Sequence, residues 1–480
     1  MGAVLKWSDG NCKFYLKSKF CMSLIRKFSQ FINLKGPGVA LVIMVLIFLA
    51  FSGYMALNLK QGIIPDEPAH LAFSKHFAST WGLPPDTAET FGLGIYIEQH
   101  PFLYYWINGR VINLIDLIQP GANEWQILTT LRIINVLFAL GTVLFCFLLS
   151  NEVIKHPWWQ LFPVFLLTNT LMFVFLAAGV NYDNLANLLT MAGLYFFTRV
   201  FTRKEFLHNS TIWMIFIALG TLVKYTILPL ALAMGVAWLI YGFVHREHIF
   251  PLHFSGAKTL LTLIVLFALF AANFLIYGVN LIRYEGLLPE CEEILLESQC
   301  EISPLVQRYH ERAIKPKMTV RESIEKGYPN PFIYAVNTWV HNMLLRTFGM
   351  IGHQSYFPLE LVRYYKILFY GAALMSLFLL KRSSSLTYSL IGISIFYALV
   401  LLYTNYNSEL EYGFIHIGFQ GRYIFPVIGP IFILFTMIAK NIPVRILRVL
   451  FVVFTLVLFI IGGPVTIIVK YHQIFSTWFV

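Results

Sequence analysis

Five charged residues stand at the ends of long apolar runs, where a charge is costly unless it has a partner or a function. They are Asp66, Glu67, Asp183, Lys224 and Arg422. Lys224 is the only charged residue between positions 211 and 244. A carboxylate can take a proton from a hydroxyl as a general base, and Lys and Arg are side chains that bind phosphate. These residues therefore predict acid–base chemistry on a phosphate-bearing substrate at a membrane surface.

Each of these charges also has an ordinary structural interpretation. Glu67 can cap a helix whose first residue is Pro68, and Asp183 can cap the helix that follows it. Lys224 can extend its ammonium group to lipid headgroups, and Arg422 can anchor the end of a span. Spacing alone leaves both interpretations open.

Three polar residues near these charges are predicted to contact substrate. His100 opens an amphipathic stretch over residues 98–106 whose aromatic side chains suit the headgroup zone. A histidine in such a place is more often an ordinary interfacial residue. Gln420 and Tyr423 flank Arg422 and share its predicted position at the start of a span.

A metal site is left open by the sequence. Asp66, Glu67, His70 and Asp183 are hard or borderline ligands, but no pair shows a dedicated spacing such as His-x-x-x-His. A divalent cation is therefore neither required nor excluded as a cofactor.

The elements that position these residues follow from composition. The chain has 480 residues, of which 58% are hydrophobic and 12% are charged. Soluble domains average about 45–50% apolar and about 25% charged residues, so a water-soluble globular protein and a disordered chain are excluded. The net charge of +11 comes from Lys and Arg that cluster between the apolar runs. That placement is typical of cytoplasmic loops and argues against nucleic-acid binding.

About eleven segments are long and apolar enough to be predicted as membrane spans. They cover residues 38–57, 127–149, 158–180, 184–201, 210–223, 226–244, 258–279, 363–380, 385–403, 423–440 and 446–469. The chain is thus predicted to be an all-α polytopic membrane protein. Basic residues fall in every second short loop, which places the N-terminus in the cytoplasm and nearly every candidate residue on the external face.

The spans divide the chain into four predicted regions. Residues 1–37 form a basic amphipathic segment on the cytoplasmic side, and residues 38–279 form a transmembrane catalytic core with a first external loop at 58–126. Residues 280–362 form a second external loop, and residues 363–480 hold the C-terminal spans. Cys291 and Cys300 share the second loop on the predicted oxidising face, which predicts a disulfide between them.

The order of these motifs resembles the glycosyltransferase-C superfamily, which includes protein O-mannosyltransferases, the lipid A aminoarabinose transferase and uncharacterised bacterial membrane proteins. Pro65-Asp66-Glu67-Pro68-Ala69-His70 and the stretch 100–105 resemble its first external loop, with an Asp-Glu pair and two juxtamembrane helices. Asp183 is similar to its second acidic position, and residues 221–225 resemble its Thr-x-x-Lys turn. Residues 422–426 match its late Arg-Tyr-x-x-Pro signature. The resemblance covers roughly residues 38–440.

The resemblance implies a GT-C-like fold and a membrane glycosyltransferase that transfers a hexosyl or pentosyl group, with inversion, from a polyprenyl-phosphate-linked donor. It implies catalytic roles for Asp66 as the general base, for Glu67 and for Asp183. It implies substrate binding by His100, Lys224, Gln420, Arg422 and Tyr423.

The implied partners are the polyprenyl-phosphate sugar, membrane lipids and an envelope acceptor, which is a glycan, a lipid or a protein. The implied location is the inner (plasma) membrane, with transfer on its external face. The alternative is a transporter or flippase of lipid-linked glycans. Transporters often place polar residues and broken helices near the membrane midplane, whereas this chain concentrates its polar residues at one face.

Overall fold

The apolar runs fold into helices in the computed structural model. The model describes residues 35–85, 88–93, 100–202, 205–246, 257–314, 316–351, 355–356, 359–379, 384–413, 419–470, 473 and 476–480. Almost all of the predicted cytoplasmic segment 1–37 lies outside these described residues. Within them, seven helices are long and apolar enough to cross a membrane, or up to nine if each of two bent helix pairs is one span.

The seven candidate spans coincide with predicted spans. They are α2 (Gly36–Asn58), α6 (Glu124–Val153), α10 (Phe206–Val223), η1 (Tyr225–Ile227) with α11 (Leu228–Val244), the run Leu260–Tyr284 through α13 (Ala257–Asn273), η2 (Phe274–Gly278) and α14 (Val279–Tyr284), α22 (Ser385–Tyr412), and η4 (Gly421–Val427) with α23 (Ile428–Asn441).

The predicted count of eleven spans is not confirmed. Two predicted spans are bent helix pairs, α7 (Pro157–Thr168) with α8 (Leu171–Ala177) and α24 (Arg445–Ile461) with α25 (Pro464–Lys470). Two others, α9 (Tyr182–Thr202) and α21 (Leu359–Leu379), are helical but are not among the candidate spans. α9 is buried over most of its length, so its polar residues meet other helices rather than lipid.

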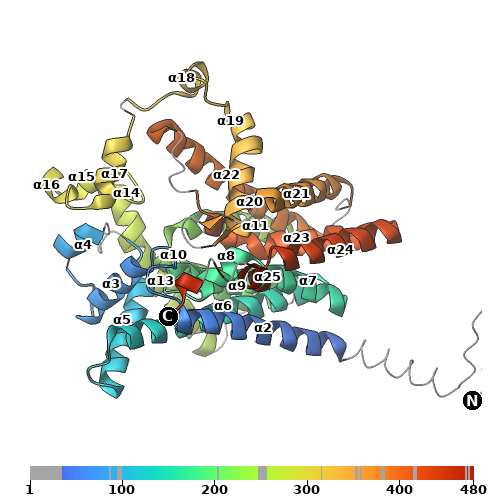
Figure 1. Cartoon of the computed structure of the whole chain (residues 1–480), viewed down its shortest axis with the longest axis horizontal. Coiled ribbons are helices and arrows are strands. Elements are labelled where there is room, and N and C mark those ends of the chain that lie inside the picture. The colour runs from blue at the N-terminus through green and yellow to red at the C-terminus, as the bar shows by residue number, and fades with distance from the viewer. Residues whose placement is uncertain are drawn as a thin grey trace, which may run out of the picture.

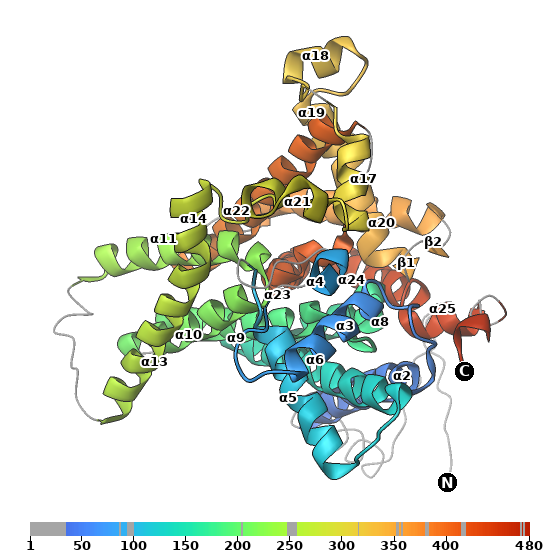
Figure 2. The same ribbon diagram turned by 90° about the vertical axis from the view of Figure 1, so that its left-hand side faces the viewer.

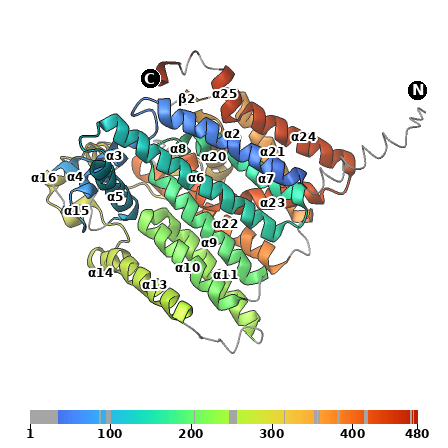
Figure 3. The same ribbon diagram turned by 90° about the horizontal axis from the view of Figure 1, so that it is seen from below.

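The helices lie roughly parallel and form a bundle with α9 at its centre. α2 packs on α6, α6 on α9, α9 on α10, and α10 on α13, and Figure 3 shows this row side by side. α7 packs on α2, α6 and α23, and α22 packs on α11 and α23, which completes the bundle. The apolar core runs through α2, α6, α8, α9, α10 and α23.

One end of the bundle carries the short helices of the two large loops. α3 (Glu67–Ala78), α4 (Ala88–Leu93) and α5 (Leu103–Ile118) come from the predicted first external loop. They gather with α14 to α17 at the left of Figure 1, and Figure 2 looks at this end. α3 and α5 cross at Gly109, where any added Cβ would collide with the backbone of Phe77. The two juxtamembrane helices therefore need a glycine at their crossing point.

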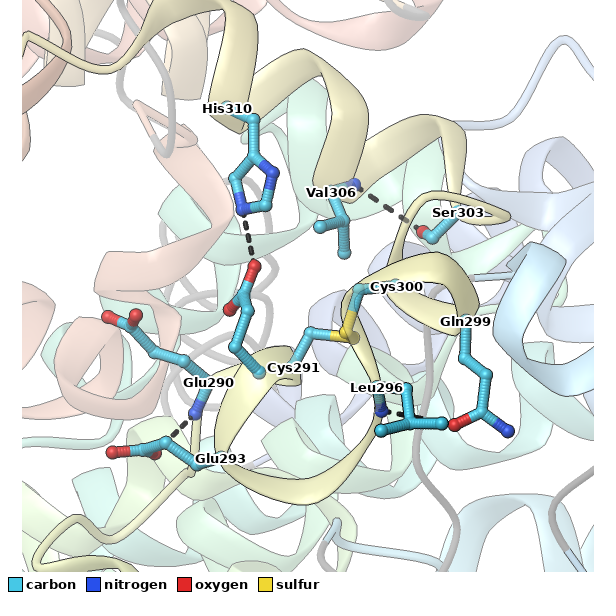
Figure 4. Close-up of a disulfide and its surroundings, with 10 residues drawn as sticks. Glu290, Cys291, Glu293, Leu296, Gln299, Cys300, Ser303, Val306 and His310 are labelled. Carbon is cyan, nitrogen blue, oxygen red and sulfur yellow. Dashed lines mark hydrogen bonds and ion pairs between the residues drawn. A yellow bond between two sulfur atoms is a disulfide. The ribbon is translucent and has the colours of Figure 1, made fainter.

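The second loop builds a small lobe around a disulfide. α15 (Cys291–Ile294), α16 (Glu297–Cys300) and α17 (Pro304–Arg312) surround the bond between Cys291 and Cys300, which have a Cα–Cα distance of 5.8 Å. Phe91 of α4 packs against both cysteines, and His310 pairs with Glu292 beside them (Figure 4). The disulfide thus closes a short turn within the second loop, and the packing of Phe91 joins that turn to the first loop.

The rest of this loop returns to the bundle. It comprises α18 (Val320–Glu325), α19 (Pro331–Ile333), η3 (Tyr334–Trp339), α20 (Val340–Phe348) and a two-stranded antiparallel hairpin, β1 (Met350–Ile351) with β2 (Ser355–Tyr356), in which Met350 pairs with Tyr356. α20 packs on α8, α21 and η4. The last residues, including η5 (Ser476–Trp478), return to the end of α2, where Phe479 bridges Leu59.

Candidate functional site

Asp66 lies in the tight turn between α2 and α3. Its backbone is left-handed, with φ of 61°, and it occupies the N-cap position of α3 without any side-chain cap hydrogen bond. Its carboxylate is therefore available to residues across the bundle. Glu67 is the first residue of α3 and Pro68 the second, so the expectation that Glu67 caps a helix starting at Pro68 is wrong. The left-handed Asp66 moves the helix start one residue earlier.

Asp183 lies in the first turn of α9, opposite the Asp66 turn. Asn181 precedes α9 and accepts a hydrogen bond from the Asp183 N–H at 2.8 Å, so Asn181 rather than Asp183 satisfies this helix end. The Asn181 side chain also donates to the Pro65 carbonyl at 3.2 Å. Asn181 therefore joins the two turns that carry the carboxylates. Asparagine is favoured before a helix start, and this signal could have identified it.

Lys224 occupies the break between α10 and α11. Its ammonium group forms an ion pair with Asp183 Oδ1. It also lies over the rings of Tyr182 and Tyr423, 4.7 and 4.5 Å from their centroids. Aromatic faces attract a cation, so a carboxylate and two rings hold the ammonium in place. Tyr182 was not among the residues predicted from the sequence to contact substrate.

Arg422 connects the two carboxylates. Its Nη2 donates to Asp66 Oδ2, and its Nε lies 3.3 Å from Asp183 Oδ2. The adjacent Gly421 lets η4 lie directly on the backbone of α20, where a Cβ would collide. The structure thus brings Asp66, Asp183, Lys224 and Arg422 into one group, which we call the charge cluster.

The charge cluster is closed on one side and open on the other. The side chains of Asp183, Lys224 and Arg422 are 4%, 5% and 5% exposed, whereas that of Asp66 is 42% exposed. Two negative and two positive charges balance within it. Asp66 is therefore the member from which solvent or substrate reaches the others.

Arg422 also has unused hydrogen-bonding capacity. Its Nη1 is buried and has no hydrogen-bond partner among the described residues, and its Nε meets Asp183 only as an ion pair. Asp183 Oδ2 likewise accepts no hydrogen bond within that part of the chain. Buried guanidinium groups normally use their donors, so the unused Nη1 indicates a place for a missing acceptor.

Glu67 belongs to a second, separate ion pair. Arg132 of α6 donates to both of its oxygens, at 2.8 and 2.6 Å, and both side chains are fully buried. Glu67 also accepts the Val180 N–H at 3.1 Å. Arg132 donates in addition to the carbonyls of Ala56, Leu59 and Lys60. Arg132 went unnoticed in the sequence, although a charge inside a predicted span was the available signal.

His70 lies one turn after Asp66, enclosed by aromatic rings. Its Nδ1 is 2.9 Å from the hydroxyl of Tyr105, and its ring meets Tyr182 edge-on at 4.6 Å. Burial lowers the pKa of His70 to about 4, although Asp66 opposes the shift. The imidazole is therefore neutral at pH 7.

Three further residues, Tyr423, Gln420 and His100, were predicted to contact substrate. Tyr423 lies within the site, under Lys224. Gln420 is half-buried at the start of η4, where its carbonyl accepts the Tyr423 N–H at 3.0 Å. His100 is half-buried and precedes α5 by three residues.

The donor set does not fit a divalent cation. Asp66 forms an ion pair with Arg422, and Asp183 forms one with Lys224. Both oxygens of Glu67 already accept hydrogen bonds from Arg132. Within the described ranges, no group of three His, Cys, Asp or Glu side chains is arranged to hold a metal ion. A cation placed here would have to displace or repel the positive side chains.

Comparison with known proteins gives structural relatives only. No family model and no curated protein matches this chain. ArnT from Cupriavidus metallidurans bound to undecaprenyl phosphate is similar with 13% identity over 85% of this chain and 61% of that one, at a TM-score of 0.43. The Archaeoglobus fulgidus oligosaccharyltransferase AglB, in complex with an inhibitory peptide and a dolichol-phosphate, is similar with 15% identity over 91% and 56%, at a TM-score of 0.49.

This chain therefore spans about three fifths of the length of the solved structures to which it is similar. Both are GT-C glycosyltransferases, the superfamily that the sequence motifs resemble.

Proposed function

We propose that this protein is a membrane glycosyltransferase that moves a sugar from a polyprenyl-phosphate-linked donor to a hydroxyl acceptor. The observation that carries the proposal is the buried Arg422, whose Nη1 has no acceptor among the described residues. Asp183 contacts both Arg422 and Lys224, so two cationic side chains lie close together. A phosphate oxygen is an acceptor of the right charge, and a guanidinium group can bind two such oxygens at once. The end of an apolar helix bundle is a suitable place for a phosphate on a lipid chain.

Donor binding would change the partners of Arg422. The charge cluster is neutral before binding, so an added phosphate leaves it with an excess negative charge. Asp66 is the most exposed member, and Arg422 is its ion-pair partner. We infer that the donor phosphate takes the place of the Asp66 carboxylate on Arg422. Asp66 is then released toward the acceptor, so the base becomes active when the donor is bound.

The transfer step follows from these positions. The acceptor oxygen forms a bond to C1 of the sugar while the bond from C1 to the phosphate oxygen breaks, and the phosphate leaves with the electron pair. Asp66 takes the acceptor proton as general base. Arg422 and Lys224 stabilise the charge that grows on the phosphate. Attack opposite the leaving phosphate inverts the configuration at C1, and no covalent enzyme intermediate forms.

Asp183 has a supporting role in this scheme. It touches both Lys224 and Arg422, and Tyr182 and Tyr423 cover the ammonium group. The two cations would repel each other without it, so Asp183 holds them together as one phosphate site. We propose that it acts through the cations.

The proposed location is the inner membrane, with the N-terminus in the cytoplasm and the charge cluster at the external face. The support is the alternation of basic loops along the sequence. A cysteine introduced at Glu411 should react with an impermeant reagent added outside. One introduced at Glu205, which is exposed next to the predicted cytoplasmic loop, should react only after the membrane is opened.

A transfer assay tests the function. Purified protein in detergent is given a panel of radiolabelled undecaprenyl phosphoryl sugars and a membrane extract as acceptor source. We expect label to pass to the extract with inversion at C1, and the Asp66→Asn variant to be the inactive control. Retention of configuration would contradict the mechanism, and turnover of none of the donors would contradict the function.

The same assay tests the metal. We expect excess EDTA to leave the rate unchanged, because the carboxylates of the site are occupied by cationic side chains. A rate restored only by Mg²⁺ or Mn²⁺ after EDTA would contradict this.

A further inference from the structure

His70 carries a buried nitrogen for which the mechanism above has no use. Its side chain is 4% exposed, and Nδ1 is engaged with the Tyr105 hydroxyl at 2.9 Å. Nε2 is buried and has no hydrogen-bond partner among the residues that the structure describes. A buried polar atom without a partner is destabilising and rare. Its retention indicates that something outside the chain completes it.

The place of His70 connects this nitrogen with the charge cluster. His70 follows Asp66 by one turn of α3. The Tyr182 ring meets the His70 ring on its edge and also carries the Lys224 ammonium group. All four members of the charge cluster act electrostatically on the imidazole. The His70 ring therefore adjoins, through Tyr182, the groups proposed to bind phosphate and to remove the acceptor proton.

The hydrogen-bonding properties of a neutral imidazole limit which chemical groups can pair with Nε2. If Nδ1 carries the proton and donates it to Tyr105, Nε2 is an acceptor. If the Tyr105 hydroxyl donates to Nδ1, Nε2 carries the proton and is a donor. A hydroxyl satisfies either state, because it both donates and accepts. Phosphate oxygens only accept, and the cations of the cluster already serve them.

We propose that His70 Nε2 binds a hydroxyl group of the substrate, on the sugar of the donor or on the acceptor. The proposal rests on the proposed function, since it presumes a sugar-bearing substrate at the charge cluster. It makes His70 a substrate-binding residue that orients a hydroxyl beside Asp66.

Two variants of His70 separate the two nitrogens. In His70→Gln the amide reaches roughly as far as Nε2 and loses the Nδ1 contact. In His70→Asn the amide replaces Nδ1, keeps the contact with Tyr105 and leaves the Nε2 position empty. Tyr105→Phe is the matched control, because it removes the Nδ1 partner and keeps Nε2. A ligand role predicts that His70→Asn is the damaged protein. A purely structural role predicts damage in His70→Gln and Tyr105→Phe instead.

Binding measurements distinguish the two sources of the hydroxyl. Undecaprenyl phosphate serves as the sugar-free probe, and undecaprenyl phosphoryl glucose, mannose and galactose as probes with sugar hydroxyls. If the hydroxyl belongs to the donor, His70→Asn should bind the preferred sugar probe about three- to tenfold more weakly and undecaprenyl phosphate as wild type does. If it belongs to the acceptor, all donor probes should bind normally and the KM for acceptor should rise by a similar factor.

The remaining outcomes overturn the proposal. Wild-type values for His70→Asn in both measurements, or damage only in His70→Gln and Tyr105→Phe, would refute the role of Nε2 while leaving the proposed function intact. Failure of the wild-type protein to bind undecaprenyl phosphate or any sugar probe would instead refute the proposed function, and the role of His70 with it.

Discussion

Two neighbouring carboxylates of this protein lie in opposite kinds of surroundings. Glu67 and Arg132 form a pair in which both side chains are fully buried. Asp66, one residue earlier, belongs to the charge cluster and is 42% exposed. The same helix start therefore serves two groups of charges, one inside the bundle and one at its open end.

The two arginines show the difference most clearly. Each nitrogen of the Arg132 guanidinium group donates a hydrogen bond, to Glu67 or to the carbonyls of Ala56, Leu59 and Lys60. Arg422 is as well buried but makes one hydrogen bond within the described residues, to Asp66. A group whose bonds are complete has nothing left for a ligand. A group with unused donors in a buried place is set up to bind one.

The comparison also explains how the two carboxylates of the charge cluster are held in place. Glu67 accepts the Val180 N–H, three residues before Asp183, and follows Asp66 directly. Arg132 fastens Glu67 to the end of α2. The complete pair thus fixes the spacing of the two carboxylates that the incomplete cluster uses. Stability and chemistry are assigned to adjacent residues.

The largest effect is expected on turnover, when the carboxylate of Asp66 is removed. Asp66→Asn should reduce turnover by about 10²–10⁴-fold, which is the contribution of a general base, and should leave the melting temperature unchanged. Glu67→Gln should lower the melting temperature and retain much more activity per folded molecule. Turnover and melting curves of the two variants measure this, and an inactive Glu67→Gln beside an active Asp66→Asn would reverse the assignment.

The next largest effect is expected on stability, when the buried pair of Glu67 and Arg132 is broken. Arg132→Met leaves the Glu67 carboxylate buried without its counter-charge, and loss of one partner from such a pair costs about 3–5 kcal/mol. We expect a large loss of folded protein in thermal unfolding. Arg321→Met is the matched control, because its pair with Glu325 is exposed and its loss should not move the melting temperature. Equal behaviour of the two variants would contradict the structural role.

A smaller effect tests the phosphate site. Arg422→Lys keeps the charge but loses the two-pronged guanidinium geometry, and a hydrogen bond to a charged group contributes about 1.5–3 kcal/mol. We expect undecaprenyl phosphate to bind roughly 10- to 100-fold more weakly. Lys224→Met should also weaken binding. Full donor affinity in Arg422→Lys would remove the phosphate role of Arg422.

The smallest effect is a dependence of stability on pH that arises from the buried His70. Its pKa is about 4 in the folded protein and about 6.5 in an unfolded chain. Below pH 6.5 the unfolded state takes up a proton that the folded state refuses, so stability falls as the pH drops toward 4. The loss between pH 7 and 5 is about 2 kcal/mol. Melting curves of His70→Gln should show a shallower slope, and identical slopes would contradict the assignment.

The amino-acid sequence was enough to predict the all-helical membrane class, the positions of most spans and the turns that hold the candidate residues. Composition and apolar run length are local quantities, so they can be seen without a structure. The motifs containing Asp66, Asp183, Lys224 and Arg422 stand in the same order as those of a known superfamily, which indicated that they belong together. The predicted span count is not confirmed: α9, for example, is buried by other helices and need not be apolar throughout.

The pairing of the charges depends on the packing of the helices. Arg422 and Asp66 are 356 positions apart, and Arg132 and Glu67 are 65 apart. No local pattern specifies such a partner, since it depends on how the helices pack. The same packing gives every nitrogen of the Arg132 guanidinium group a hydrogen bond. It leaves Nη1 and Nε of Arg422 without a hydrogen-bond acceptor among the described residues. It also links His70 to the charge cluster, because the imidazole meets Tyr104 and Tyr105 of α5 and the Tyr182 ring that carries the Lys224 ammonium group. Identity and spacing name the candidates, and burial determines which of them stabilise the fold and which remain available to a substrate.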